Sequence, residues 1–187
     1  MLIAFHKPFG VISQFTDDGS HRVTLAAFRF PPGVYPLGRL DADTEGLLLL
    51  SDEAPLNARL LLPEQRHTRE YWAQVENVPT PGALQELANG IEIQGRRTLP
   101  CRAWVLDPQP DIAARNPPIR YRKSVLTRWL GLELMEGKNR QVRRMTAAIG
   151  HPTLRLLRVR IGRFGLGQLP AGSWKLLTQE EKALVFA

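Results

Sequence analysis

The chain of 187 residues has a single cysteine, Cys101, and only four histidines, which are scattered along the sequence. One cysteine excludes a disulfide framework, and the histidines lack the spacing of a metal site. No apolar run approaches the length that spans a membrane, and the start shows no signal-peptide pattern. These absences predict a cytoplasmic protein that holds neither a metal nor a disulfide.

Acidic residues are missing from one long stretch, residues 137–179, which we call the acid-free segment. The whole chain has 25 Lys and Arg against 18 Asp and Glu, a net charge of +7. A solvated surface normally mixes both signs, so this segment predicts contact with a nucleic-acid backbone. The alternative is an ordinary soluble basic protein. The residues predicted to bind RNA from this segment are Lys138, Arg140, Arg144, Arg155 and Arg158.

The chain is 43% hydrophobic and 23% charged, ordinary values that allow one substantial core or two small ones. Alternating apolar residues predict strands, and Pro8 and Gly10 indicate a turn between two short strands. The other strands are expected within residues 66–75, 91–105, 124–135 and 154–161. With no regular βαβ rhythm, the mixture predicts an α+β fold whose mixed, largely antiparallel sheet is flanked by short helices and loops.

Helices are expected at residues 52–62, 80–90 and 136–149, and after Thr178. Thr80 and Pro81 are typical of a helix start, and Gly90 of a helix end. Thr178 and Glu181 have the spacing of a capping box. In the third helix, Arg140, Arg143 and Arg144 are predicted to share one face.

Residues 36–52 form the most informative stretch, a polar acid-rich loop that runs into the four leucines 47–50. The leucines predict a buried strand, and carboxylates at such a boundary are candidates for reactive groups. Asp41, Asp43 and Glu45 also follow calcium-loop spacing, but Pro36 and Gly38 oppose the entering helix. A glycosidase carboxylate pair is only weakly indicated, and a solvated turn is the commonest reading of such a pattern.

Four motifs occur together and in order: KPFGV at 7–11, GRLDADTEGLLLL at 38–50, Tyr71, and EGKNRQVRRM at 136–145. With them, the chain resembles the RsuA/RluB/E/F family of ribosomal RNA pseudouridine synthases over nearly its whole length. RNPPIR at 115–120, RKS at 122–124 and QFT at 14–16 further resemble the E branch of this family.

The resemblance implies that the protein isomerises a uridine of 23S rRNA to pseudouridine, near the peptidyl-transferase region for an E-branch member. It implies a pseudouridine synthase fold with the active-site cleft across the sheet. Residues 1–187 would be one catalytic domain, without the S4 domain that many relatives carry. No cofactor is implied. The expected partner is 23S rRNA or a large-subunit assembly intermediate, and the expected state is a monomer.

The family's site residues transfer by position. Its catalytic aspartate matches Asp41, which would act as nucleophile or base, with both a covalent and a glycal route open. Its tyrosine matches Tyr71, able to stack on uracil and pass a proton. Its basic partner matches Arg143, which would keep the carboxylate ionised, and the apolar wall of the uracil pocket matches Leu177.

Two further basic residues lie inside these motifs. Arg39 is placed to enter the stack left by a flipped uridine, or else to pair with Asp43. Lys7 either touches phosphate or covers the sheet, and we assign it no role. A catalytically silent RNA-binding or ribosome-assembly protein on the same fold would explain the acid-free segment equally well. The presence of Asp41, Tyr71 and Arg143 favours the enzyme.

Overall fold

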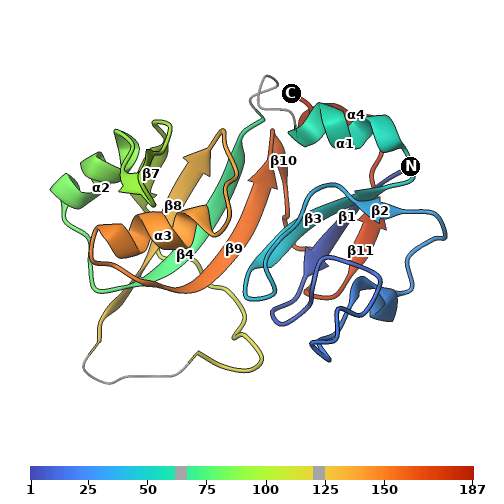
Figure 1. The fold of residues 1–187 in the computed structure, drawn as a ribbon, viewed down its shortest axis with the longest axis horizontal. Coiled ribbons are helices and arrows are strands. Elements are labelled where there is room, and N and C mark those ends of the chain that lie inside the picture. The colour runs from blue at the N-terminus through green and yellow to red at the C-terminus, as the bar shows by residue number, and fades with distance from the viewer. Residues whose placement is uncertain (62–66, 120–124) are drawn as a thin grey trace. The chain divides into compact units, whose positions relative to one another are not determined.

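A computed structural model describes residues 1–61, 67–119 and 125–187 of the chain (Figure 1). The chain folds into two compact units, one made of Met1–His67 and Leu157–Ala187 (unit 1) and the other of Thr68–Leu156 (unit 2). Each unit buries its own cluster of apolar side chains. The sequence allowed either one core or two, and the structure has two.

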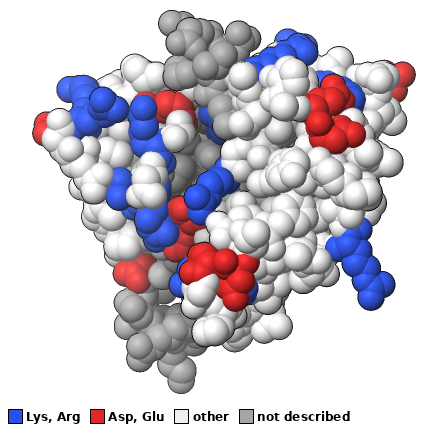
Figure 2. Space-filling model, turned by 45° about the vertical axis from the view of Figure 1, so that its right-hand side comes forward, with Lys and Arg blue, Asp and Glu red and all other residues white. Residues whose placement is uncertain are grey.

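Charged side chains are unevenly spread over the face that Figure 2 shows. On that face Lys and Arg gather in several clusters, and Asp and Glu lie close to some of them (Figure 2). Within the described part of the chain, no helix is both long and apolar enough to cross a membrane.

Unit 1 is built on the buried strand β3 (Glu45–Ser51), in which all seven residues are buried. β3 pairs antiparallel with β1 (Leu2–Lys7), which pairs in turn with β11 (Trp174–Leu176). On its other side β3 pairs parallel with β9 (Thr153–Ile161) at Glu45↔Leu157 and Gly46↔Arg158. Two short strands complete this part: β2 (Tyr35–Pro36) on β3 and β10 (Phe164–Gly165) on β9.

The described part of unit 1 has three helices: the short 3-10 helix η1 (Leu25–Phe28), α1 (Ala54–Leu61) and α4 (Gln179–Val185). The predicted capping box of α4 is confirmed. The Thr178 hydroxyl accepts from the Glu181 backbone N–H, and the Glu181 carboxylate accepts from the Thr178 N–H. Such a cap satisfies two backbone donors at the helix start.

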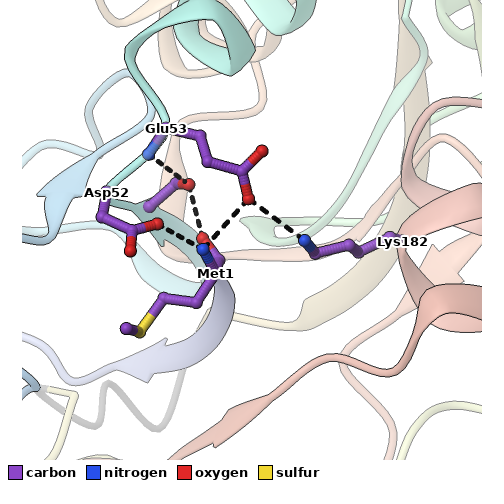
Figure 3. A network of polar contacts seen from close by, with 5 residues as sticks. Met1, Asp52, Glu53 and Lys182 are labelled. Carbon is purple, nitrogen blue, oxygen red and sulfur yellow. Dashed lines mark hydrogen bonds and ion pairs between the residues drawn. The ribbon is translucent and has the colours of Figure 1, made fainter.

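A polar network joins the start of β1, the start of α1 and helix α4 (Figure 3). The Met1 amino group donates to the carboxylates of Asp52 and Glu53, and Lys182 donates to Glu53 at 3.2 Å. These hydrogen bonds raise the pKa of the amino group and lower the pKa of both carboxyls. All four groups are partly exposed, so the network contributes only modestly to stability.

Unit 2 contains the antiparallel strands β4 (Arg69–Glu76), β8 (Thr127–Leu134) and β7 (Arg102–Val105), in the order β4-β8-β7. The first part of β9 also belongs to this unit. A small hairpin forms from β5 (Glu92–Ile93) and β6 (Arg96–Arg97), joined by a turn at Gln94 and Gly95. Helices α2 (Pro81–Ala88) and α3 (Gln141–Ala148) complete the unit.

The predicted α+β class is confirmed: in the described residues, four short α-helices accompany strands whose pairings are antiparallel except that of β3 with β9. The start of α2 is also confirmed, since the Thr80 hydroxyl accepts from the Ala83 N–H at 3.2 Å and Pro81 begins the helix. Gly90 follows the helix with a φ of +84°, as its predicted role as a C-terminal residue requires.

Two local predictions are wrong. The run after Gly10 is not a strand, because its backbone bonds to separate loops: Gly10 N–H to Ala42 C=O and Ile12 N–H to Val23 C=O. The helix expected from residue 136 begins only at Gln141. The Gln141 side chain accepts from the Lys138 N–H and donates to Glu136, which holds the preceding residues in a loop.

The late start of α3 also changes the arginine pattern. Arg140 is the N-cap residue, with a left-handed φ of +51°, and lies outside the helix. It therefore does not share a helical face with Arg143 and Arg144, contrary to the i, i+3, i+4 prediction. That spacing holds only where every residue of the set has helical backbone angles.

Gly46 lies where strands β3 and β9 of unit 1 approach each other closely. Its φ is +102°, and a Cβ atom there would lie 2.3 Å from the carbonyl oxygen and 2.7 Å from the nitrogen of Arg158. Both atoms are backbone, so they cannot move unless β3 and β9 separate. Only glycine fits this position.

We therefore expect Gly46→Ala to cost about 3 kcal/mol or more of unfolding free energy, because the added methyl forces two paired strands apart. Gly33→Ala is the matched control: Gly33 also has a positive φ, +79°, but nothing lies within 4 Å of the position that an alanine methyl would occupy. It should cost only about 1 kcal/mol, from backbone strain alone. Urea unfolding of both variants measures the difference, and equal losses would contradict the steric explanation.

Candidate active site

Asp41 lies in a short turn directly before the buried strand β3. The Thr44 N–H donates to the Asp41 carbonyl at 3.0 Å and closes the turn, and Thr44 and Glu45 are buried. On the other side, the Ser13 hydroxyl donates to the Leu40 carbonyl at 2.8 Å and accepts from the Leu40 N–H at 3.0 Å. The backbone is thus fixed on both sides of Asp41, whose own side chain is half-buried.

Lys7 ties this turn to the end of β1. It is completely buried, and its ammonium donates to the carbonyls of Val11 at 2.6 Å, Pro8 at 3.0 Å and Ala42 at 3.5 Å. Ala42 directly follows Asp41, so one buried cation connects the KPFGV turn to the aspartate loop. Of the two alternatives for Lys7, the structure favours neither: it lies beneath the loop and holds main-chain carbonyls.

Burial lowers the pKa of the Lys7 ammonium from 10.5 to about 8. The negative charges of Glu45, Asp43 and Asp41 act in the opposite direction, and the Arg158 guanidinium lowers the pKa further. Desolvation is therefore stronger than the attraction of three carboxylates. The Asp41 loop is thus held by the Lys7 ammonium, whose charged form is destabilised by burial.

Arg158 is the second buried cation of this region. It is 5% exposed, its Nε donates to the Leu47 carbonyl at 2.8 Å, and its Nη2 is buried without a hydrogen-bond partner among the described residues. Lys7 lies near the carboxylates of Asp41, Asp43 and Glu45, and the Arg158 guanidinium lies near Lys7.

Tyr71 and Arg143 belong to unit 2. Tyr71 lies on β4 opposite Leu132, is half-buried, and packs against the apolar cluster of this unit. Arg143 lies on α3, half-buried, and its Nη1 donates to the Thr153 carbonyl at 3.2 Å. Asp41 lies in unit 1, so its pairing with Arg143 and the cleft across the sheet stay predictions.

Leu177 and Arg39 both belong to unit 1. Leu177 is 8% exposed, lies in the apolar cluster, and its N–H donates to the Leu2 carbonyl at 2.9 Å. Arg39 is exposed, and no described residue forms an ion pair with it, so the alternative pairing with Asp43 is absent. Its guanidinium is accordingly available to a ligand.

The five cations predicted to bind RNA differ in exposure. Lys138 and Arg140 are exposed, and Arg144 is half-buried and donates to Gln94 and Asn139. Arg155 and Arg158 are buried, and Arg155 donates to the Ala113 carbonyl at 2.9 Å while its guanidinium lies 6.0 Å from the Trp129 ring. The exposed pair is therefore better placed to meet phosphate. The RKS motif at 122–124 lies outside the described residues.

The structural roles of Lys7 and Ser13 were not predicted from the sequence. A lysine that ends an apolar strand just before a proline is the available signal for Lys7, but sequence alone does not tell burial from solvent coverage. Ser13 lies 27 residues from its partner Leu40, and nothing local marks it. Among the described residues, no group of three or more His, Cys, Asp or Glu is arranged to hold a metal ion.

Comparisons with known proteins show one family. The family model for RNA pseudouridylate synthase matches residues 1–148. The chain is 47% identical to ribosomal large subunit pseudouridine synthase E of Xanthomonas campestris pv. campestris, over 94% of this chain and 95% of that protein. It is 46% identical to the Vibrio parahaemolyticus protein of the same name, over 93% and 72% of the two chains.

A solved structure shows the same fold. The crystal structure of a pseudouridylate synthase superposes with a TM-score of 0.81 at 26% identity, covering 98% of this chain and 73% of the other. This likeness confirms the predicted pseudouridine synthase fold.

We expect Lys7→Met to destabilise the fold by about 2 kcal/mol or more, because carbonyls around the ammonium lose their donor. Between pH 8 and 10.5 the unfolded chain keeps a proton that folded Lys7 has released, so wild-type stability rises with pH in this window. The Met side chain does not titrate, so the difference in unfolding free energy between wild type and the less stable variant should grow as pH rises.

Urea unfolding of wild type and Lys7→Met at pH 7.5 and 9.5 measures this change. Lys138→Met, which removes an exposed ammonium, is the control and should stay close to wild type at both pH values. A deficit of Lys7→Met that is the same at both pH values would show that the buried ammonium is not desolvated.

Proposed function

The chain belongs to the RNA pseudouridylate synthase family, and on this premise we propose that it isomerises one uridine of large-subunit ribosomal RNA to pseudouridine. The observation that supports the substrate is the 47% identity, over almost the whole of both chains, to a protein named for this activity. The E-branch motifs favour a site in 23S rRNA near the peptidyl-transferase region, in free rRNA or an assembly intermediate. Residues 1–187 would act as one catalytic domain and as a cytoplasmic monomer.

The reaction breaks the bond between uracil N1 and ribose C1′, turns the base, and joins C5 to C1′. C5 loses its proton and N1 gains one, so the atoms balance without oxidation or reduction. The step needs an ionised carboxylate beside C1′ as nucleophile or base. Asp41 is suited to this role because its loop is fixed on both sides and lies near the Lys7 ammonium.

The other proposed site residues contact the uracil base, the Asp41 carboxylate or the base stack around the uridine. Tyr71 would stack on the uracil and pass a proton, and Leu177 would form an apolar wall beside it. Arg143 would pair with Asp41 and direct its carboxylate. Arg39, exposed and without a protein ion pair among the described residues, would fill the stack that the extruded uridine leaves.

We expect Asp41→Asn to lower pseudouridine formation at least about a thousandfold, because the amide can act neither as nucleophile nor as base. Asp43→Asn, which removes a neighbouring carboxylate of the same turn, should cost less than about tenfold. Release of tritium from C5-labelled uridine in rRNA measures turnover, and filter binding shows whether RNA affinity is kept. Wild-type turnover in the Asp41 variant would refute the assignment.

Phosphate contact by the acid-free segment predicts that log affinity for rRNA falls linearly with log salt concentration. Replacing the exposed pair by Lys138→Gln with Arg140→Gln should reduce the slope by about two, one per lost contact. The matched pair Arg155→Ala with Arg158→Ala should reduce it less, because both guanidinium groups are buried. A larger change from the buried pair would show that RNA reaches these groups in the complex.

A further inference from the structure

We propose that a pocket in unit 1 binds one unpaired nucleotide next to the target uridine, and so reads the RNA sequence beside the modified position. The inference rests on the proposed function. The pocket has a volume of about 310 Å³ and is lined by Ser13, Gln14, Pro36, Gly38, Arg39 and Asn57. This volume is at the lower end of the range for small-ligand sites, roughly 300 to 1,000 Å³, and suits a single nucleoside.

The lining offers hydrogen-bonding groups that the protein does not use. Within the described chain, neither the Arg39 guanidinium nor the Asn57 amide has a hydrogen-bond partner, and neither is buried. The Gln14 amide makes one bond, from Nε2 to the Thr16 carbonyl at 2.9 Å, which leaves its carbonyl oxygen as an acceptor. Two amides and a guanidinium remain for a ligand.

These groups match the chemistry of a nucleotide. An amide carries both donor and acceptor and can bond two positions on the edge of one base, which distinguishes bases from one another. A guanidinium can stack on a base or bond a phosphate. No Asp or Glu lines the pocket within the described chain, so no carboxylate there would repel the phosphodiester.

The position of the pocket links it to the reacting uridine. Arg39 lines the pocket, and Asp41 follows two residues later, so their Cα atoms are at most about 7 Å apart. Ser13 also lines the pocket, and its hydroxyl holds the peptide of Leu40 between them. The fixed backbone from Arg39 to Asp41 suits two adjacent nucleotides of the RNA, with the target uridine at Asp41 and its neighbour at Arg39.

The pocket is also formed in the protein without RNA. Pro36 lies on β2, which pairs with β3, while Asn57 lies on α1 and Gln14 follows the residue that bonds Leu40. The walls thus come from three segments whose backbones are held independently. A preformed site costs little ordering when the base enters.

The test uses single-turnover kinetics on rRNA fragments that contain the uridine modified by the wild-type enzyme, as located by carbodiimide mapping. Each of the four bases is placed in turn at the positions flanking that uridine. Wild type should prefer one base at one flanking position by about tenfold. Asn57→Ala and Gln14→Ala should each reduce this preference to less than about threefold, because the amide that distinguishes the bases is lost.

The control is Gln179→Ala, which removes an exposed glutamine of helix α4 in the same unit and should keep the wild-type preference. Thermal unfolding checks that each variant is folded. If Gln14→Ala does not fold, the base preference of Asn57→Ala alone decides the test. Equal base preference in wild type and Asn57→Ala, with normal pseudouridine formation, would overturn this inference alone. Absence of pseudouridine from wild-type reactions would instead overturn the proposed function.

Discussion

The buried ammonium of Lys7 is the interaction on which the candidate site depends. It is the last residue of β1, and it holds carbonyls of both the KPFGV turn and the Asp41 loop. A desolvated cation is costly unless its donors are bonded and negative charge lies near it. Here main-chain carbonyls and three nearby carboxylates supply both, so the acid-rich loop and the lysine stabilise one another.

Hydrogen bonds and close backbone packing together determine where Asp41 lies. The parallel pairing of β3 with β9 leaves no room for a side chain at Gly46, and Gly46 pairs with Lys7 of β1. The same short stretch therefore sets the spacing of the sheet and the start of the acidic loop. A carboxylate in the turn before such a strand has little freedom to move away. This restriction favours a preorganised site, in which the carboxylate is in position before the substrate binds.

Much of this fold follows from local patterns. The leucine run of β3, the Thr80-Pro81 helix start and the capping box of α4 act over a few residues, so periodicity and capping rules predicted them. The start of α3 was missed because the Gln141 side chain bonds backward to the preceding loop, an option that helical spacing does not reveal. Burial of Lys7, Arg155 and Arg158, like the bond from Ser13 to Leu40, depends on contacts between distant residues.

The pair of hydrogen bonds between the Ser13 hydroxyl and the Leu40 backbone has a consequence for how this protein can evolve. These two bonds fix both ends of the segment between Ser13 and Leu40, in which residues 16–23 are exposed. Inserting residues there would add only a slowly growing loop-closure entropy and would leave the pinned ends in place. This surface loop can therefore lengthen or shorten among descendants, and so acquire new RNA contacts, while Asp41, the aspartate that we propose as catalytic, keeps its position.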